Sequence, residues 1–286
     1  MVKPPLIANI SDTARWVAFY RAMESERPDA VFKDPYARRL AGPRGEAIVN
    51  AMPKGREMAW PMIVRTALLD ELIMRLVKHD EVDCVLNLAA GLDARPWRLP
   101  LPTALRWLDV DHPAMIDAKL EVLATESPRC VYEGVRLDLS DTPARHELFN
   151  RVNAQARRAL VITEGLLVYL PPPVVAELAS DLHRQPCFHF WLTDLGSPGL
   201  LKMIAKSWGP VLAAGNASFQ FGPAESTEFF RPQGWRELEW RSLFDEGLRL
   251  KRTMRFAGFF KLLGQLAPRK KREEFKRFSG VALLER

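Results

Sequence analysis

The sequence predicts an α/β fold in which a mostly parallel sheet carries helices on both faces. After about residue 80, short β-type runs alternate with helical patterns, the order typical of a parallel sheet. Each of the first five runs ends at an acidic residue or at a glycine turn that contains one. The 286 residues, 48% of them hydrophobic, suffice for one large domain or two small ones. We expect a single domain, 1–286.

A helical N-terminal cap, residues 1–80, is expected to precede the sheet. Leu69, Leu72 and Leu76 recur at helical spacing within 61–79, and Arg65 lies at the head of the same stripe. The core is expected over 81–195. Its strands are predicted at 82–88, 105–110, 130–136, 159–163 and 188–193, and its helices at 113–124, 143–156 and 174–182.

The region after residue 195 is less regular and rich in aromatic side chains. Glycine and proline punctuate residues 196–234, which also hold Trp208 and Phe219. This pattern is typical of a mobile lid with apolar contacts to a substrate, or of a loop-rich subdomain that packs its own aromatic residues. Residues 235–286 are expected to return to the core, with a last strand at 278–284.

Composition narrows the possible functions. Cys84, Cys130 and Cys187 lie far apart and near the starts of apolar runs, which predicts buried thiols and no metal site. Much of the net charge of +6 comes from 269–277, where glutamates interrupt the basic run as on a solvated helix, so no nucleic-acid partner is expected. No apolar run is long enough to span a membrane and no signal peptide is visible, so we expect a cytoplasmic protein without a membrane partner.

The turn after the first strand carries the strongest single motif. The segment 89–93 is small and flexible enough to let the backbone approach a nucleotide closely. Asp109 and Asp111 follow about 20 residues later, where a carboxylate can accept both ribose hydroxyls. Ligands of open α/β sheets bind at this carboxyl edge. The motif therefore predicts a nucleotide-like ligand there.

The same turn favours S-adenosylmethionine over a dinucleotide. A nicotinamide enzyme is expected to carry G-x-G-x-x-G, but Ala89 stands at the first glycine position and Asp93 lies within the turn. The Asp93 carboxylate would repel a pyrophosphate, whereas it would attract a cationic sulfonium. An NAD-dependent oxidoreductase is kept as the lesser alternative.

Several motifs occur together in a specific order: RAMESERPDA (21–30), DPYA (34–37), VRT (64–66), NLAAGLDAR (87–95), DVDHP (109–113), LDL (137–139) and TEGLLVYL (163–170). In this order they resemble the leucine carboxyl methyltransferase family of class I methyltransferases, whose bacterial members include polyketide O-methyltransferases. The resemblance covers about residues 11–170 and is loose thereafter. It implies a Rossmann-like fold with a seven-stranded sheet, an N-terminal helical extension and a lid insertion.

The resemblance also implies a role for each matching residue. Arg65 would hold the methionine carboxylate of S-adenosylmethionine, Ala89 and Gly91 would form the adjoining turn, Asp111 would bind the ribose, Asp138 and Leu139 would frame the adenine, and Glu164 would face the amino group. Tyr169, Trp208 and Phe219 are candidates for substrate contact.

Structural roles compete with several of these assignments. Arg65 could extend to solvent from an amphipathic helix, Asp111 could cap the helix that begins at Pro113, and Asp138 could stabilise a turn. Tyr169 could belong to the core. His112 and His189 are not assigned as bases.

The expected reaction is O-methylation of a small-molecule acceptor. A carboxylate is preferred to a phenol because it is already ionised at neutral pH. The family turn usually reads Gly-Ala-Gly, so Ala89 is a departure. A negative φ at Ala89 would absorb the extra methyl, whereas a required positive φ would weaken cofactor binding. A non-catalytic binding protein on the same scaffold is therefore the second alternative.

Overall fold

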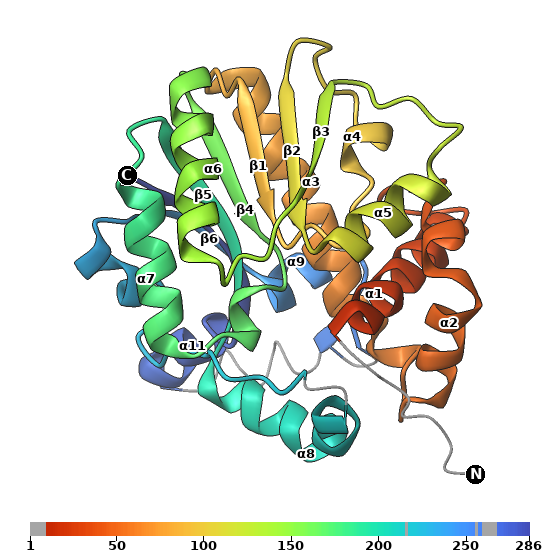
Figure 1. Cartoon of the computed structure of the whole chain (residues 1–286). Coiled ribbons are helices and arrows are strands. Elements are labelled where there is room, and N and C mark those ends of the chain that lie inside the picture. The colour runs from red at the N-terminus through yellow and green to blue at the C-terminus, as the bar shows by residue number, and fades with distance from the viewer. Residues whose placement is uncertain (1–9, 215–216, 255–256, 259–267) are drawn as a thin grey trace.

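A seven-stranded sheet organises the protein (Figure 1). The computed structural model describes residues 10–214, 217–254, 257–258 and 268–286. Within them the strand order is β3-β2-β1-β4-β5-β7-β6. The strands are β1 (Cys84–Leu88), β2 (Arg106–Asp111), β3 (Val131–Arg136), β4 (Ala159–Thr163), β5 (Phe188–Gly196), β6 (Arg236–Ser242) and β7 (Ser279–Glu285). β7 alone runs antiparallel to its neighbours β5 and β6, so the predicted fold class is confirmed.

Alternating side chains of the strands build a core on each face of the sheet. On β4, Val161 packs with α6 (Thr142–Gln155) and α7 (Pro172–His183). Its neighbours Leu160 and Ile162 point the other way and pack with α3 (Trp60–His79) and α9 (Leu243–Arg249). This alternation is the two-residue period of a strand buried on both faces.

The N-terminal helices form a third cluster beside the carboxyl edge of the sheet. α1 (Ile10–Ser25), α2 (Ala37–Ala51) and η1 (Glu57–Ala59) pack against α4 (Arg95–Arg98) and α5 (Pro113–Val122). Trp16, Phe19 and Tyr20 of α1 are buried there with Trp97 of α4. The described part of the predicted helical cap, from residue 10 onward, therefore consists mainly of helices and lies against the core.

Residues 198–214 differ from the irregular structure predicted for them. They form one helix, α8 (Pro198–Ala214), which lies beyond the carboxyl ends of the parallel strands (Figure 1). Pro198 occupies its first position, where proline is tolerated. Leu200, Ile204 and Trp208 recur every four residues and are the less exposed side chains. This apolar stripe offsets the cost of Gly209, roughly 1 kcal/mol.

Of the remaining short elements, η2 (Leu167–Tyr169) and α11 (Arg269–Lys276) lie at the same edge, while η3 (Ser226–Gln233) packs against α7 and β6. β5 continues to Gly196, three residues past its predicted end, because Asp194, Leu195 and Gly196 pair with β7. In the described residues, every helix is either too short or too polar to cross a bilayer.

A fully buried ion pair joins β2 to α5. Lys119 Nζ lies 2.7 Å from Asp109 Oδ2, and neither side chain is exposed. Asp109 also accepts hydrogen bonds from Asn87 and from the Trp107 indole. Burial nevertheless raises the pKa of Asp109 above its ordinary value, although Lys119 opposes that rise. Loss of the lysine would therefore leave a buried carboxylate without a charged partner.

We expect Lys119→Met to lower the free energy of unfolding by about 3–5 kcal/mol, because it leaves Asp109 unpaired in the interior. Urea unfolding followed by circular dichroism measures the change. Lys276→Met is the matched control, since its surface pair with Glu273 spans 3.4 Å and should contribute less than about 1 kcal/mol. Equal effects of the two variants would contradict this prediction.

Candidate functional site

A cavity of about 860 Å³ opens at the carboxyl edge of the parallel strands, near the upper end of the roughly 300–1,000 Å³ typical of small-molecule sites. All ten site residues proposed from the sequence line it: Arg65, Ala89, Gly91, Asp111, Asp138, Leu139, Glu164, Tyr169, Trp208 and Phe219. The structure therefore brings the whole predicted set together. Their individual roles stay predictions.

One carboxylate from each of the first five strand ends lines this cavity. They are Asp93, Asp111, Asp138, Glu164 and Asp194. The strands are parallel, so their carboxyl ends meet at one edge and gather residues that are distant in sequence. The predicted row of acidic residues is confirmed in position.

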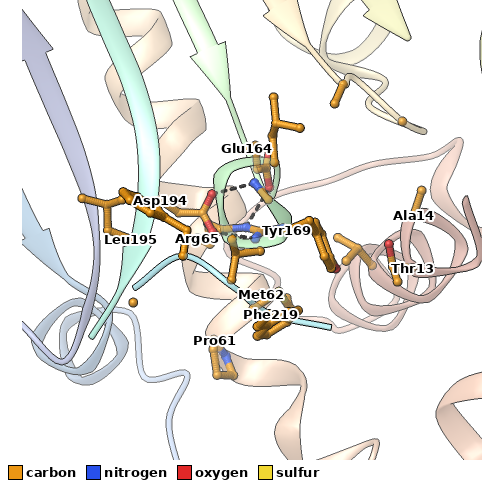
Figure 2. A pocket seen from close by; sticks show the side chains of 18 of the residues that line it. Thr13, Ala14, Pro61, Met62, Arg65, Glu164, Tyr169, Asp194, Leu195 and Phe219 are labelled. Carbon is orange, nitrogen blue, oxygen red and sulfur yellow. Dashed lines mark hydrogen bonds and ion pairs between the residues drawn. The ribbon is translucent and has the colours of Figure 1, made fainter. Parts of the chain in front are cut away.

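The Arg65 side chain is buried, so the alternative in which it extends to solvent from an amphipathic helix is wrong. Its Nε donates to Glu164 at 3.0 Å and its Nη1 donates to Asp194 at 2.9 Å (Figure 2). Gly165, with φ of 64°, allows this approach, because a Cβ there would lie 3.3 Å from Nη1. The guanidinium is thus fixed between the ends of β4 and β5.

These contacts belong to a larger ion network. Arg95 lies 2.8 Å from Glu164, 2.7 Å from Asp93 and 2.7 Å from Asp70. Further contacts extend it to the N-terminal helices, and its members are Arg21, Arg65, Arg95, Arg98, Asp34, Asp70, Asp93, Glu164 and Asp194. None of these side chains is more than 20% exposed. Four arginines and five carboxylates give the network a net charge of −1.

The arginines keep the carboxylates of the network ionised. Burial works to raise the pKa of Glu164, but Arg95 and Arg65 outweigh it and lower the pKa below its ordinary value. At Asp93 burial is likewise outweighed, chiefly by Arg95, and the pKa is about 2. At neutral pH both side chains therefore offer negative charge to a ligand and have no proton to donate.

Asp111 connects the ends of β1 and β2. Its Oδ2 accepts from the backbone N–H of Gly91 at 2.7 Å, and its Oδ1 accepts from the N–H of His112 at 2.7 Å. His112, not Asp111, occupies the N-cap position of α5, so the alternative capping role is wrong. The helix begins one residue too late for the Asp111 side chain to reach its first amides.

Ala89 has a φ of 53°, in the left-handed region. An L-residue pays roughly 1–2 kcal/mol there, whereas glycine does not. Micromolar binding corresponds to about 8 kcal/mol, so this strain is too small to abolish cofactor binding by itself. The departure from Gly-Ala-Gly costs stability in the turn.

Asp138 and Leu139 form the turn after β3. Asp138 Oδ1 accepts from the N–H of Ser140 at 2.9 Å. This bond stabilises the turn, as the structural alternative for Asp138 predicts. This bond lowers the pKa of Asp138. Its side chain remains 54% exposed, so it is also accessible to a ligand. Leu139 packs against the core of the α6 face.

The three aromatic candidates join the lid region to the N-terminal helices. Tyr169 and Phe219 make an edge-to-face contact at 5.3 Å beside Met62 and Pro61 (Figure 2). Trp208 of α8 packs edge-to-face on Trp16 of α1 at 5.4 Å. Side chains of the N-terminal helices and of the lid region therefore meet across the cavity.

Sequence reasoning assigned no role to two residues that hold the site together, Arg95 and Asp194. The acid after the fifth strand was visible, but its partner Arg65 lies 129 residues away.

His189 does not line the cavity, while His112 does. Among the described residues, no cluster of histidine, cysteine or acidic side chains could hold a metal ion. The three cysteines are buried and free, as predicted.

Comparisons with known proteins find methyltransferases and proteins provisionally named as methyltransferases. A model of the leucine carboxyl methyltransferase family matches residues 14–183. A protein of Parafrankia sp., provisionally named an S-adenosyl-L-methionine-dependent methyltransferase, is 34% identical over 62% of this chain and 60% of its own length. A Streptomyces coelicolor protein with the same provisional name is 34% identical over 71% of this chain and 75% of its own. The match thus spans less than two thirds of the Parafrankia relative.

Two solved structures share the fold. One, described only provisionally as a methyltransferase, is from Thermobifida fusca and superposes with a TM-score of 0.60 at 13% identity, covering 98% of this chain and 96% of its own. A duf574 family protein from Streptomyces avermitilis gives 0.57 at 11% identity, covering 96% and 97%. At such identities the likeness concerns the fold alone.

We expect Ala89→Gly to raise the free energy of unfolding by about 1 kcal/mol, because glycine removes the left-handed strain. That corresponds to a rise in Tm of roughly 2–4 °C, measured by thermal unfolding. Ala90→Gly is the matched control: Ala90 does not have a positive φ, so the same change should lower Tm. A lower Tm for Ala89→Gly would disprove the strain.

Acid should weaken the ion network. The pKa of Asp93 is lowered on folding from 3.8 to about 2. Its contribution to stability is therefore complete above about pH 4 and is lost as the pH falls through 2. Between pH 4.5 and 2, the wild type should lose on the order of 2 kcal/mol more of its free energy of unfolding than Asp93→Asn, measured by urea titration. Parallel pH profiles would argue against this role of Asp93.

Proposed function

The chain belongs to the leucine carboxyl methyltransferase family of S-adenosylmethionine-dependent methyltransferases, and we propose that it methylates an oxygen of a small-molecule acceptor, preferably a carboxylate. The observation that carries this proposal is the row of carboxylates at the sheet edge, tied to Arg65 and Arg95. That arrangement suits a ligand with both positive charges and a carboxylate.

The charge of the site matches the cofactor. S-adenosylmethionine has a sulfonium, an ammonium and a carboxylate, hence one net positive charge. The ion network has one net negative charge and is largely shielded from water. Charges attract more strongly in such a medium than in bulk water. Electrostatics therefore favour this ligand and disfavour a pyrophosphate.

Individual residues also suit its functional groups. The Nη2 of Arg65 donates to no atom of the described residues, so it can receive the methionine carboxylate. Glu164 is ionised and can accept from the ammonium. Asp111, held by the Gly91 amide, can accept from the ribose hydroxyls, and Asp138 from the adenine amine. These assignments support the predicted roles.

The chemistry needs positioning and dryness more than proton transfer. When bound, S-adenosylmethionine would supply a methyl group on cationic sulfur to a carboxylate oxygen, and the carbon–sulfur bond would break with its electron pair left on sulfur. No proton moves. Tyr169, Phe219 and Trp208 would exclude water, which favours a reaction that disperses charge. Holding the reactants in line contributes up to roughly 7–11 kcal/mol.

A phenol acceptor is the second choice because it needs a base. Glu164 and Asp138 have lowered pKa values, and Tyr169 has a raised one. His112 is the one histidine in the described lining, and its ring lies 4.0 Å from Asp138, the residue proposed for the adenine. These positions favour an acceptor that is ionised before it binds.

Asp111→Asn should weaken S-adenosylmethionine binding roughly 10- to 100-fold, because a charged hydrogen bond to the ribose contributes about 1.5–3 kcal/mol. Titration calorimetry with S-adenosylmethionine and S-adenosylhomocysteine measures this change. Asp117→Asn is the matched control, since within the described residues Asp117 pairs only with Arg136 at the surface and lies outside the cavity.

The same titration decides the proposed function. Micromolar binding that Asp111→Asn weakens, followed by methyl transfer to members of a panel of carboxylic acids and phenols, would support it. Absence of binding at millimolar ligand would overturn it.

A further inference from the structure

We propose that the acceptor carries a long apolar chain, which lies between α8, α9 and α11, while its carboxylate points toward the charged end of the cavity, where the sulfonium of the bound cofactor would supply the opposite charge. This inference deepens the proposed function and rests on it. It names the class of acceptor as a medium- to long-chain amphiphilic acid.

The cavity has two chemically different ends. Its charged lining comes chiefly from the strand ends, around Arg65, Glu164 and Asp194. The lining contributed by α8, α9 and α11 is apolar, with Leu200, Met203 and Ile204 from α8, Phe244 from α9 and Phe275 from α11. A molecule that fills both ends must itself be polar at one end and apolar at the other.

The arginines of the cavity offer little to a small anion. Arg21 pairs with Asp34, Arg145 with Asp181 and Glu177, and Arg65 with Glu164 and Asp194. The remaining donor of Arg65 is proposed for the cofactor. A short acid would therefore find no unpaired arginine in the described lining. Most of its binding free energy is therefore expected to come from apolar contact.

Exposed apolar side chains gather at the rim of the same cavity. The large hydrophobic residues that are exposed in the described structure are Val131, Val174, Met203, Leu238, Met254 and Phe275. Four of these six line the cavity: Val174, Met203, Met254 and Phe275, each 40–47% exposed. Clustered exposed apolar surface marks ligand grooves and interaction sites. Its continuity with the apolar interior favours a chain that enters through this rim.

Straight-chain acids test the inference. Hexanoate, octanoate, decanoate and dodecanoate are titrated by calorimetry, below their micelle concentrations, into protein saturated with S-adenosylhomocysteine. Each added methylene should strengthen binding about fourfold, as expected for burial of roughly 0.8 kcal/mol per methylene, until the chain reaches the rim. Affinity that is independent of chain length would overturn the proposal.

Matched variants locate the chain. Met203→Ser should weaken dodecanoate binding roughly tenfold and hexanoate binding less, because only the longer chain reaches α8. Leu238→Ser removes a side chain of similar exposure, 48% against 45%, that lies outside the cavity, and should change neither affinity. Binding of S-adenosylhomocysteine should be equal in all three proteins. Equal losses of dodecanoate affinity in both variants would contradict the placement.

The outcomes separate this inference from the proposed function. Loss of the proposed function would appear as absent cofactor binding in the wild type. If the cofactor binds and short acids are methylated, but chain length has no effect, only the apolar-chain inference fails. A wild-type dimer that Met203→Ser dissociates, seen by light scattering, together with a flat chain-length series, would assign the rim to a second copy and also overturn it.

Discussion

The structure depends on the requirement that buried charges be paired. Arg65 on α3, Arg95 on α4, Glu164 after β4 and Asp194 in β5 form a chain of three ion pairs and are largely inaccessible to water. Removing one partner of such a group typically lowers the free energy of unfolding by about 3–5 kcal/mol, because the remaining charges are buried with neither a partner nor water. The N-terminal helices therefore cannot shift relative to the sheet edge without a large penalty. The position of the charged end of the cavity, around Arg65 and Glu164, is set by this electrostatic constraint as much as by packing.

The same constraint explains why the cavity has a fixed charged end and an apolar wall that is less constrained. The network fixes charge at the strand ends, where a cofactor with opposite net charge is expected to bind. The opposite wall is α8, which is attached to the rest through apolar and aromatic contacts such as Trp208 on Trp16. Apolar contacts are not directional and tolerate sliding better than ion pairs with fixed geometry. With the acceptor placed against α8 as proposed, its specificity can vary in α8 while the cofactor end stays unchanged.

The sequence predicted the sheet core and the carboxylate row well, because both follow from local periodicity and from the geometry of parallel strands. It did not predict the pairing of Arg65 with Asp194, since nothing local links residues 129 positions apart. β6 was missed because this edge strand, Arg236–Ser242, is rich in charged residues and lacks a clean apolar alternation. The glycines and prolines of 198–214 concealed the apolar stripe of α8. The conformation of Ala89 likewise depends on the turn, not on the residue.

The position of β7 has a consequence for how the protein reaches its native state. β6 precedes β7 in the chain but lies outside it, and in the described sheet β6 pairs only with β7. β6 therefore stays outside the sheet until residues 279–285, alone or already paired with β6, have paired with β5. During that interval the edge of β5, which carries the buried Trp191 and Leu192, presents unpaired backbone and apolar surface. Changes in 243–278 that delay this step are expected to appear first as aggregation during expression, even where the cofactor end is intact.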